Sequence, residues 1–388
     1  ITLQEDTETL DEVVVVGYGV QKKSDVTGAM ARVGEKELKA MPVRNALEGM
    51  QGKTAGVDIT SSQRPGEVGN INIRGQRSIN AEQGPLYVVD GMVIQNGGIE
   101  NINPSDIEAI DILKDASATA IYGSRGANGV ILVTTKKGKE GKVTLNYSGT
   151  VTFETLHDVT EMMSATEWLD YARLAKYNAG SYASATPTFE ADKAAFGSVS
   201  ASWKNIEQAW SNGNYDPSKV GSYDWASHGK QTGITHEHTL SASGGSDKFQ
   251  GYASFGYLDQ KGTQPGQAYE RYTLKTSFDV TPVDWFKMGS SINASYSTQD
   301  YGYSFSKSVT GSGDFYSALR SMIPWTVPYD ENGEYVRYPS GDVNIINPIR
   351  ELDYNTNQRR TFRASASMYS QIDFGKIWKP LEGLSYRL

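Results

Sequence analysis

The chain has 388 residues, with 37 Lys and Arg against 45 Asp and Glu, and a formal net charge of −8. This acidic balance argues against nucleic-acid binding, which requires a basic surface, and the absence of cysteine excludes disulfides, thiolate metal sites and a cysteine nucleophile. The apolar runs are far shorter than the ~18 residues that a membrane helix needs, whereas the ~10-residue strands of a membrane β-barrel are compatible with the sequence.

Residues 35–140 predict a compact mixed α/β unit whose short elements are separated by Gly-rich turns. Helical turns are expected at Lys36–Met41, Asn45–Met50, Pro104–Ile107 and Ala116–Tyr122. Strands are expected at Val57–Thr60, Asn70–Arg74, Leu86–Val89, Glu108–Lys114 and Gly129–Thr135.

From Lys142 onward the pattern changes to long two-residue alternation. In Val143–Glu154 the odd positions form an apolar or aromatic face and the even positions form a polar face. Further strands of this kind are expected at Thr235–Gly244, Lys248–Gln260, Arg271–Val280, Phe286–Tyr296, Phe362–Phe374 and Leu384–Leu388. In a soluble sandwich the apolar face would meet a second sheet, and in a membrane barrel it would meet lipid.

The lengths of strands and connections distinguish these two interpretations. The strands run for about 10 to 14 residues, whereas sandwich strands usually have ~5–6. Two connections are long, about 80 residues at 155–234 and about 60 at 298–359, and Gly245–Asp247 and Pro282–Asp284 are tight links. Short turns on one side and long loops on the other are typical of an up-and-down membrane barrel. A soluble β-domain with two insertions is the alternative.

A run of β-branched residues near the N-terminus is preceded by acidic residues and ended by glycines. It consists of Asp11, Glu12, Val13, Val14, Val15, Val16, Gly17, Tyr18 and Gly19. The run is too short to bury itself. It is therefore either an edge strand of the following unit or a strand donated to a partner sheet by β-augmentation, in which backbone hydrogen bonds supply the affinity.

Residues Asp11–Gly19 resemble the Ton box region of SusC/RagA-type TonB-dependent outer-membrane transporters. The resemblance continues in the family's order at Asn45–Val57, Asn72–Asn80, Pro85–Gly91, Asn103–Gly123 and Ser124–Lys136. The sequence departs from the family in two respects. Only the tail Ile1–Leu10 stands in place of a small N-terminal β-domain, and most of the barrel is absent.

This resemblance implies a membrane β-barrel of ~22 strands with an N-terminal α+β plug domain inside its lumen. Only about seven strands are visible, so the chain is expected to be a fragment of such a protein. We expect an N-terminal tail with the Ton box at residues 1–22, a plug domain at 23–140, and the first part of the barrel with long extracellular loops at 141–388.

The resemblance further implies TonB-dependent import of large nutrients, either oligosaccharides or peptides, across the outer membrane of a Gram-negative, Bacteroidota-type bacterium. The implied partners are a SusD-like surface lipoprotein, TonB with ExbB and ExbD, and outer-membrane lipid, and the family suggests a dimer of heterodimers. No cofactor is expected, and the lack of an identifiable catalytic constellation disfavours an enzyme. The alternative is a soluble or surface β-rich glycan- or peptide-binding protein without transport.

Substrate contact is expected in the polar segment Gln76–Gly84, which the resemblance places as a plug loop facing the lumen. Its donors and acceptors are Arg77, Ser78, Asn80, Glu82 and Gln83. The alternative is that this segment packs against the barrel wall. Arg74 ends an apolar strand next to Gly75 and is expected to form an internal ion pair.

The remaining motifs do not indicate a metal site. His236 and His238 share a strand face but lack a third ligand nearby, so an aromatic-girdle or interface position is expected. Asp330–Glu334 lacks the rest of a calcium-loop pattern and is expected to form a turn. The aromatic-rich long loops either contact a substrate or partner, or build a small core of their own.

Overall fold

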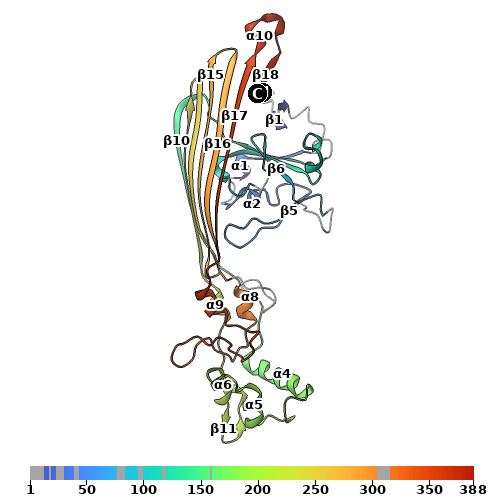
Figure 1. Cartoon of the computed structure of the whole chain (residues 1–388), viewed down its shortest axis with the longest axis vertical. Helices are drawn as coiled ribbons and strands as arrows, with labels where there is room; N and C mark the ends of the chain where they lie inside the picture. Colours follow the sequence, from blue (N-terminus) through green and yellow to red (C-terminus); the bar gives the residue numbers. More distant parts are fainter. Residues whose placement is uncertain are drawn as a thin grey trace, which may run out of the picture.

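The computed structural model describes residues 13–16, 19–22, 30–38, 43–76, 84–94, 99–115, 119–157, 160–303 and 315–388. A tall curved sheet, termed the wall, stands beside a smaller α/β unit, and a lobe of helices and loops extends from one end of the wall (Figure 1). No helix within these ranges is long and apolar enough to cross a membrane.

The wall is an antiparallel sheet of seven strands, each paired with its neighbour along the chain. The strands are β10 (Gly141–Glu154), β13 (Gly233–Gly245), β14 (Phe249–Lys261), β15 (Gln267–Val283), β16 (Phe286–Tyr301), β17 (Gln358–Asp373) and β18 (Ser385–Arg387). The predicted strands are thus confirmed, but β15 and β17 begin before the predicted Arg271 and Phe362. Residues 358–361 of β17 are polar on both faces, so the alternation does not reach the start of that strand.

The wall has one apolar and one polar face, as the alternation predicts. Leu145 and Phe362 on the outer face are 74% and 70% exposed. Lys275 and Ser277 on the inner face are 2% and 6% exposed, because the α/β unit lies against that face. An exposed apolar surface of this kind marks a contact with another apolar phase or partner.

The α/β unit contains a five-stranded sheet in the order β3-β8-β9-β6-β7 and a two-stranded sheet β4-β5. The strands are β3 (Met30–Gly34), β4 (Val57–Ile59), β5 (Ile71–Ile73), β6 (Leu86–Val89), β7 (Met92–Val93), β8 (Ile107–Leu113) and β9 (Val130–Thr135). The helices are α1 (Glu35–Leu38) and α2 (Ala46–Met50), with 3-10 helices η2 (Pro104–Asp106) and η3 (Ala120–Gly126). The prediction missed β3 and β7, which lie at the two edges of the sheet and are too short to show an alternation. The predicted helix Ala116–Tyr122 corresponds in its described part to η3.

The core of the α/β unit lies on both sides of strands β8 and β9. Ile110 and Ile131 belong to one hydrophobic cluster together with Met50 of α2, whereas Leu113 and Leu132 belong to a second cluster. Strands that are covered on both faces tend to read in the sequence as nearly continuous apolar runs, as β9 does, although β8 also carries Glu108 and Asp111. This two-sided core makes the unit a folded body that can dock as a whole.

The two long connections between wall strands fold together into the lobe, residues 160–232 and 315–357. Its helices are α4 (Ala165–Asn178), α5 (Phe189–Phe196), α6 (Ser200–Glu207), α8 (Phe315–Arg320) and α9 (Pro348–Tyr354). Its smaller elements are β11 (Trp210–Ser211), β12 (Asn214–Tyr215), η4 (Pro217–Lys219) and η5 (Ala226–Gly229). At the opposite end of the wall, α10 (Phe374–Ile377) and η6 (Lys379–Leu381) connect β17 to β18.

The two connections share one interior. Trp325 of the second connection packs edge-on against Trp168 of α4. Asn205 Nδ2 of α6 donates to the Trp325 carbonyl at 2.8 Å, and Ser202 Oγ donates to the Pro339 carbonyl at 2.7 Å. Of the two alternatives for the loop aromatics, the structure shows a small core of their own.

A buried ion pair joins α4 to α5 inside the lobe. The side chains of Arg173 and Asp192 are 6% and 0% exposed and contact each other, with Arg173 Nε donating to Asp192 Oδ1 at 3.0 Å. Tyr182 and Trp210 also donate to Asp192, at 2.7 and 3.0 Å. Burial, together with the hydrogen bond and charge of Asp192, raises the pKa of Tyr182 to about 12. Tyr182 therefore stays protonated and donates at neutral pH.

Candidate functional site between the α/β unit and the wall

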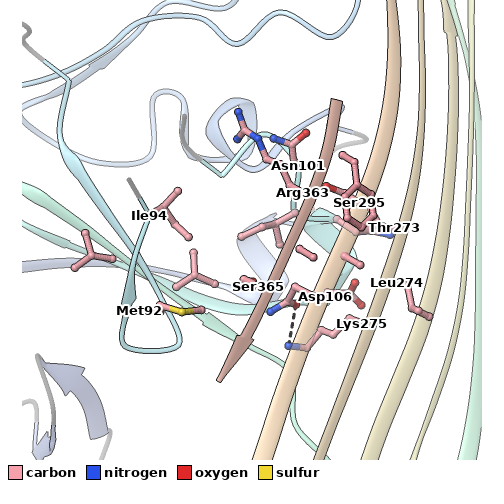
Figure 2. A pocket seen from close by; sticks show the side chains of 18 residues that line it. Met92, Ile94, Asn101, Asp106, Thr273, Leu274, Lys275, Ser295, Arg363 and Ser365 are labelled. Atoms are coloured by element: carbon pink, nitrogen blue, oxygen red, sulfur yellow. Dashed lines mark hydrogen bonds between the residues drawn. The ribbon is translucent and has the colours of Figure 1, made fainter. Parts of the chain in front are cut away.

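A cavity of about 460 Å³ lies between the β6–β7 hairpin of the α/β unit and strands β15–β17 of the wall. Figure 2 shows Met92 and Ile94 on the side of the α/β unit, and Thr273, Lys275 and Arg363 on the side of the wall. The lining combines apolar and charged groups from segments that are far apart in the sequence.

Asp90 lies in the two-residue turn between β6 and β7, where Val89 pairs with Met92. Asp90 and Gly91 have φ angles of 49° and 87°, which a tight hairpin requires and which Asp and Gly tolerate better than most residues. The Asp90 carboxylate reaches β9, where Oδ1 accepts a hydrogen bond from the Thr135 backbone N–H at 2.9 Å and Oδ2 accepts one from the Thr135 hydroxyl. The α/β unit thus holds this carboxylate in place by itself.

Lys275 of β15 supplies the positive charge opposite Asp90. Its Nζ lies 3.7 Å from Asp90 Oδ2, and the two side chains are 2% and 9% exposed. Nζ also donates to the Thr135 hydroxyl and, at 3.4 Å each, to Ser291 Oγ and Asn293 Oδ1 of β16. A buried ammonium group is stable only with such partners, and two of them belong to the α/β unit. We term Asp90, Thr135 and Lys275 the Lys275 anchor.

Two further hydrogen bonds hold the η2 segment against β13 and β14. Tyr252 Oη donates to Asp106 Oδ1 at 2.8 Å, and Asn103 Nδ2 donates to Thr239 Oγ1 at 2.9 Å. Asp106 and Asn103 are both almost fully buried. Together with the Lys275 anchor, these contacts tie the α/β unit to three adjacent strands of the wall, β13, β14 and β15.

At the lobe end of the interface, Glu100 joins the α/β unit to β15 and β17. Arg363 Nη1 donates to Glu100 Oε1 at 2.9 Å, and Arg271 Nη1 donates to the Glu100 carbonyl at 2.6 Å. Burial and the negative charge of Glu100 raise the pKa of Tyr87, which keeps its phenol neutral. A second cavity of about 230 Å³ lies here, lined among others by Glu100, Arg359 and Arg363. It presents both signs of charge and suits a polar ligand.

The structure places only part of the predicted binding residues. Val13–Val16 form strand β1, and Gly19 begins strand β2 (Gly19–Lys22). The other predicted Ton box residues, Asp11, Glu12, Gly17 and Tyr18, lie outside the described residues. The predicted substrate-facing residues also lie outside them, namely Arg77, Ser78, Asn80, Glu82 and Gln83. Both assignments remain predictions.

Other residues singled out from the sequence have defined surroundings. Arg74 forms an ion pair with Asp115 within the α/β unit, as predicted. The described ranges contain no group of three or more His, Asp or Glu that could hold a metal ion. On the outer face, His238 Nδ1 and Tyr147 Oη share a hydrogen bond of 2.8 Å. Asp330 Oδ1 accepts from the backbone N–H groups two and four residues further on, which closes a turn.

Sequence reasoning missed the Lys275 anchor. In the sequence, Lys275 is one more polar residue on the polar side of an alternating strand, and Asp90 is an ordinary turn residue before Gly91. One signal was available, because Lys275 stands between the small polar residues Thr273 and Ser277 on the same face. A long cation between small polar residues on such a face needs a partner from the opposite surface.

Known proteins are similar to this chain in both sequence and fold. Residues 22–130 match the TonB-dependent Receptor Plug Domain family. A TonB-dependent receptor of Formosa agariphila is 34% identical over 100% of the chain and 34% of its own length. The TonB-dependent receptor SusC of Bacteroides thetaiotaomicron is 32% identical over 92% of the chain and 33% of its own length. The chain therefore spans about a third of the length of these relatives.

The solved structures include a close match to this fold. The RagAB peptide importer in its open-open state superposes with a TM-score of 0.73 at 28% identity, covering 93% of this chain and 40% of the importer chain. All of these relatives are receptors or importers. Their similarity extends through both the α/β unit and the wall.

Proposed function

The chain belongs to the SusC/RagA-type TonB-dependent receptors, of which it comprises the plug and the first barrel strands, and we propose on this premise that it is part of a TonB-dependent nutrient importer. The α/β unit is the plug. The proposed division assigns residues 1–22 to the tail with the Ton box, 23–140 to the plug and 141–388 to the barrel in the outer membrane of a Gram-negative, Bacteroidota-type bacterium.

The observation that carries this proposal is the seating of the plug on the polar face of a wall whose other face is apolar. The Lys275 anchor and the bonds of Asp106 and Asn103 hold a folded body where a passage would otherwise lie. A barrel closed in this way transports only if the plug moves, so import needs an energy source on the periplasmic side. TonB, driven through ExbB and ExbD by the inner-membrane proton gradient, would supply it by pulling on the N-terminal tail.

The proposed substrate is an oligosaccharide or a peptide too large for a porin. The similar RagAB protein is a peptide importer, which supports peptides as one of these two classes. The lobe would receive the substrate together with a SusD-like surface lipoprotein. We propose that the substrate contacts the plug first at Arg77, Ser78, Asn80, Glu82 and Gln83.

Deletion of Asp11–Gly19 in the full-length transporter tests the proposal. We expect growth on the transported nutrient to be lost, while membrane insertion and substrate binding by the purified protein stay at wild-type levels. Deletion of the preceding tail Ile1–Leu10 is the matched control and should leave growth intact. Uptake at the wild-type rate without Asp11–Gly19 would contradict TonB-dependent import and favour a binding protein without transport.

A further inference from the structure

The predicted TonB-binding strand is not a lone strand in this structure. β1 pairs antiparallel with β2 in the register Val13 with Lys22, Val14 with Gln21, Val15 with Val20 and Val16 with Gly19. The two strands form a separate two-stranded sheet, whose strand β1 contacts β9 of the plug. Figure 1 shows β1 on the side of the plug that faces away from the lobe, toward the end where the short turns of the wall lie. This is the end from which a periplasmic protein would reach it.

Among the described residues, no strand pairs with the second edge of β1, which we term its open edge. In an antiparallel ladder, directly opposed residues alternate between pairs that exchange hydrogen bonds and pairs that do not. Val16 and Gly19 close the hairpin with two residues between them, and such a closing pair exchanges its hydrogen bonds. Val14 and Gln21 then form the next bonded pair. The N–H and C=O groups of Val13 and Val15 consequently point away from β2, toward the open edge.

A partner strand would find β1 already extended. A free four-residue segment loses conformational freedom when it is added to a sheet, and a segment held in its bound conformation loses less. An isolated two-stranded hairpin is marginally stable at best, and a third strand stabilises it. Both effects favour addition of a strand to β1 while β2 remains in place.

We propose that β2, Gly19–Lys22, is part of the TonB-binding element, and that a TonB strand adds to the open edge of β1 to complete a three-stranded sheet. This inference rests on the proposed function and extends the binding element beyond the Ton box. The alternative, in which TonB must displace β2 to reach β1, gives the opposite result in each experiment below.

Proline substitutions at neighbouring positions of β2 separate the two arrangements. Proline removes the backbone N–H, which matters only where that group is bonded. Gln21→Pro removes a donor directed at β1, whereas Val20→Pro, the matched control, removes one directed away from it. The C-terminal domain of the cognate TonB is titrated into the purified full-length transporter by calorimetry. We expect Gln21→Pro to weaken binding roughly tenfold and Val20→Pro to change it less than twofold, because only the first unpairs β1.

A reversible crosslink provides a second test. Val13 and Lys22 are an opposed pair without mutual hydrogen bonds, whose close Cα atoms suit a disulfide, and the chain contains no other cysteine. In the variant Val13→Cys with Lys22→Cys, oxidation locks β2 onto β1. We expect the oxidised protein to bind the TonB domain as well as the reduced one.

The outcomes separate the inference from the proposed function. If the wild-type transporter does not bind the TonB domain, both are wrong. If the wild type binds, then equal or tighter binding by Gln21→Pro overturns the inference alone. Binding that is lost on oxidation of the crosslinked variant and restored by reduction would do the same, because it would show that β2 has to leave.

Discussion

Replacing Lys275 by methionine tests whether the Lys275 anchor holds the plug in the barrel. Methionine has nearly the same length, so the change removes the charge and leaves little empty space. The buried Asp90 carboxylate then keeps its bonds to Thr135 but loses its counter-charge. At 3.7 Å and an effective dielectric constant of about 20, the lost attraction is about 4.5 kcal/mol, and removal of one partner of a buried pair typically costs about 3–5 kcal/mol. The neighbouring cavity admits some relaxation, so we expect about 3 kcal/mol.

Hydrogen–deuterium exchange of the full-length transporter measures this cost locally. A loss of about 3 kcal/mol should speed exchange of the amides of β6 and β9 on the order of a hundredfold, if they exchange through release of the plug. The double variant with Asp90→Asn should recover most of the loss, because Asn keeps an acceptor for the Thr135 N–H and tolerates a positive φ. Lys287→Met is the matched control. In the wild type, Lys287 Nζ lies 4.0 Å from Asp279, and the Lys287 side chain is 44% exposed. Loss of this exposed ion pair should cost less than about 1 kcal/mol. Wild-type exchange rates in Lys275→Met, or a double variant no better than the single one, would refute the reasoning.

Two other predictions concern the wall and the plug loop. Leu145→Arg, on the exposed apolar face, should impair barrel assembly by about 2–4 kcal/mol if the site lies near the membrane midplane. Asn146→Arg, on the polar face, should impair assembly less. Equal yields of folded full-length barrel for both variants would contradict a lipid-facing surface. Alanine at Arg77, Asn80 and Glu82 should weaken substrate binding measured by calorimetry without changing the melting temperature. Unchanged affinity with a lower melting temperature would show that this segment is a packing element.

The wall could be predicted because its strands are long and carry one alternating pattern each, from Val143 to the strand that ends at Asp373. The interface with the plug could not. Alternation shows that Lys275 and Ser277 share the inner face, but it does not show that both are buried. In the sequence Ser277 therefore looks tolerant of a large side chain, whereas in the structure it is 6% exposed and has little room for an arginine. The partners of Lys275 in the plug are more than a hundred positions away in the chain, and no local pattern encodes such a pairing.

Local reasoning was also limited for buried carboxylates. Asp106 follows Pro104 in a short helical turn, where a carboxylate usually caps the turn or faces water. The fold instead directs it onto Tyr252 of the wall. Arg74 was predictable as an ion-pair partner because it ends an apolar strand, and its partner Asp115 lies in the same unit. Pairings within one unit could thus be anticipated, whereas pairings between units depend on how the two bodies dock.

The shared interior of the lobe restricts how these loops can be exchanged between relatives. Trp325 and Pro339 of the second connection receive their hydrogen bonds from Asn205 and Ser202 of the first, and Trp325 packs on Trp168. A chimera that replaces only one connection would leave half of an aromatic interior exposed and several buried donors unpaired. Residues 155–232 and 302–357 therefore have to be transplanted together, as one cassette, if the lobe of one relative is to be moved onto the wall of another.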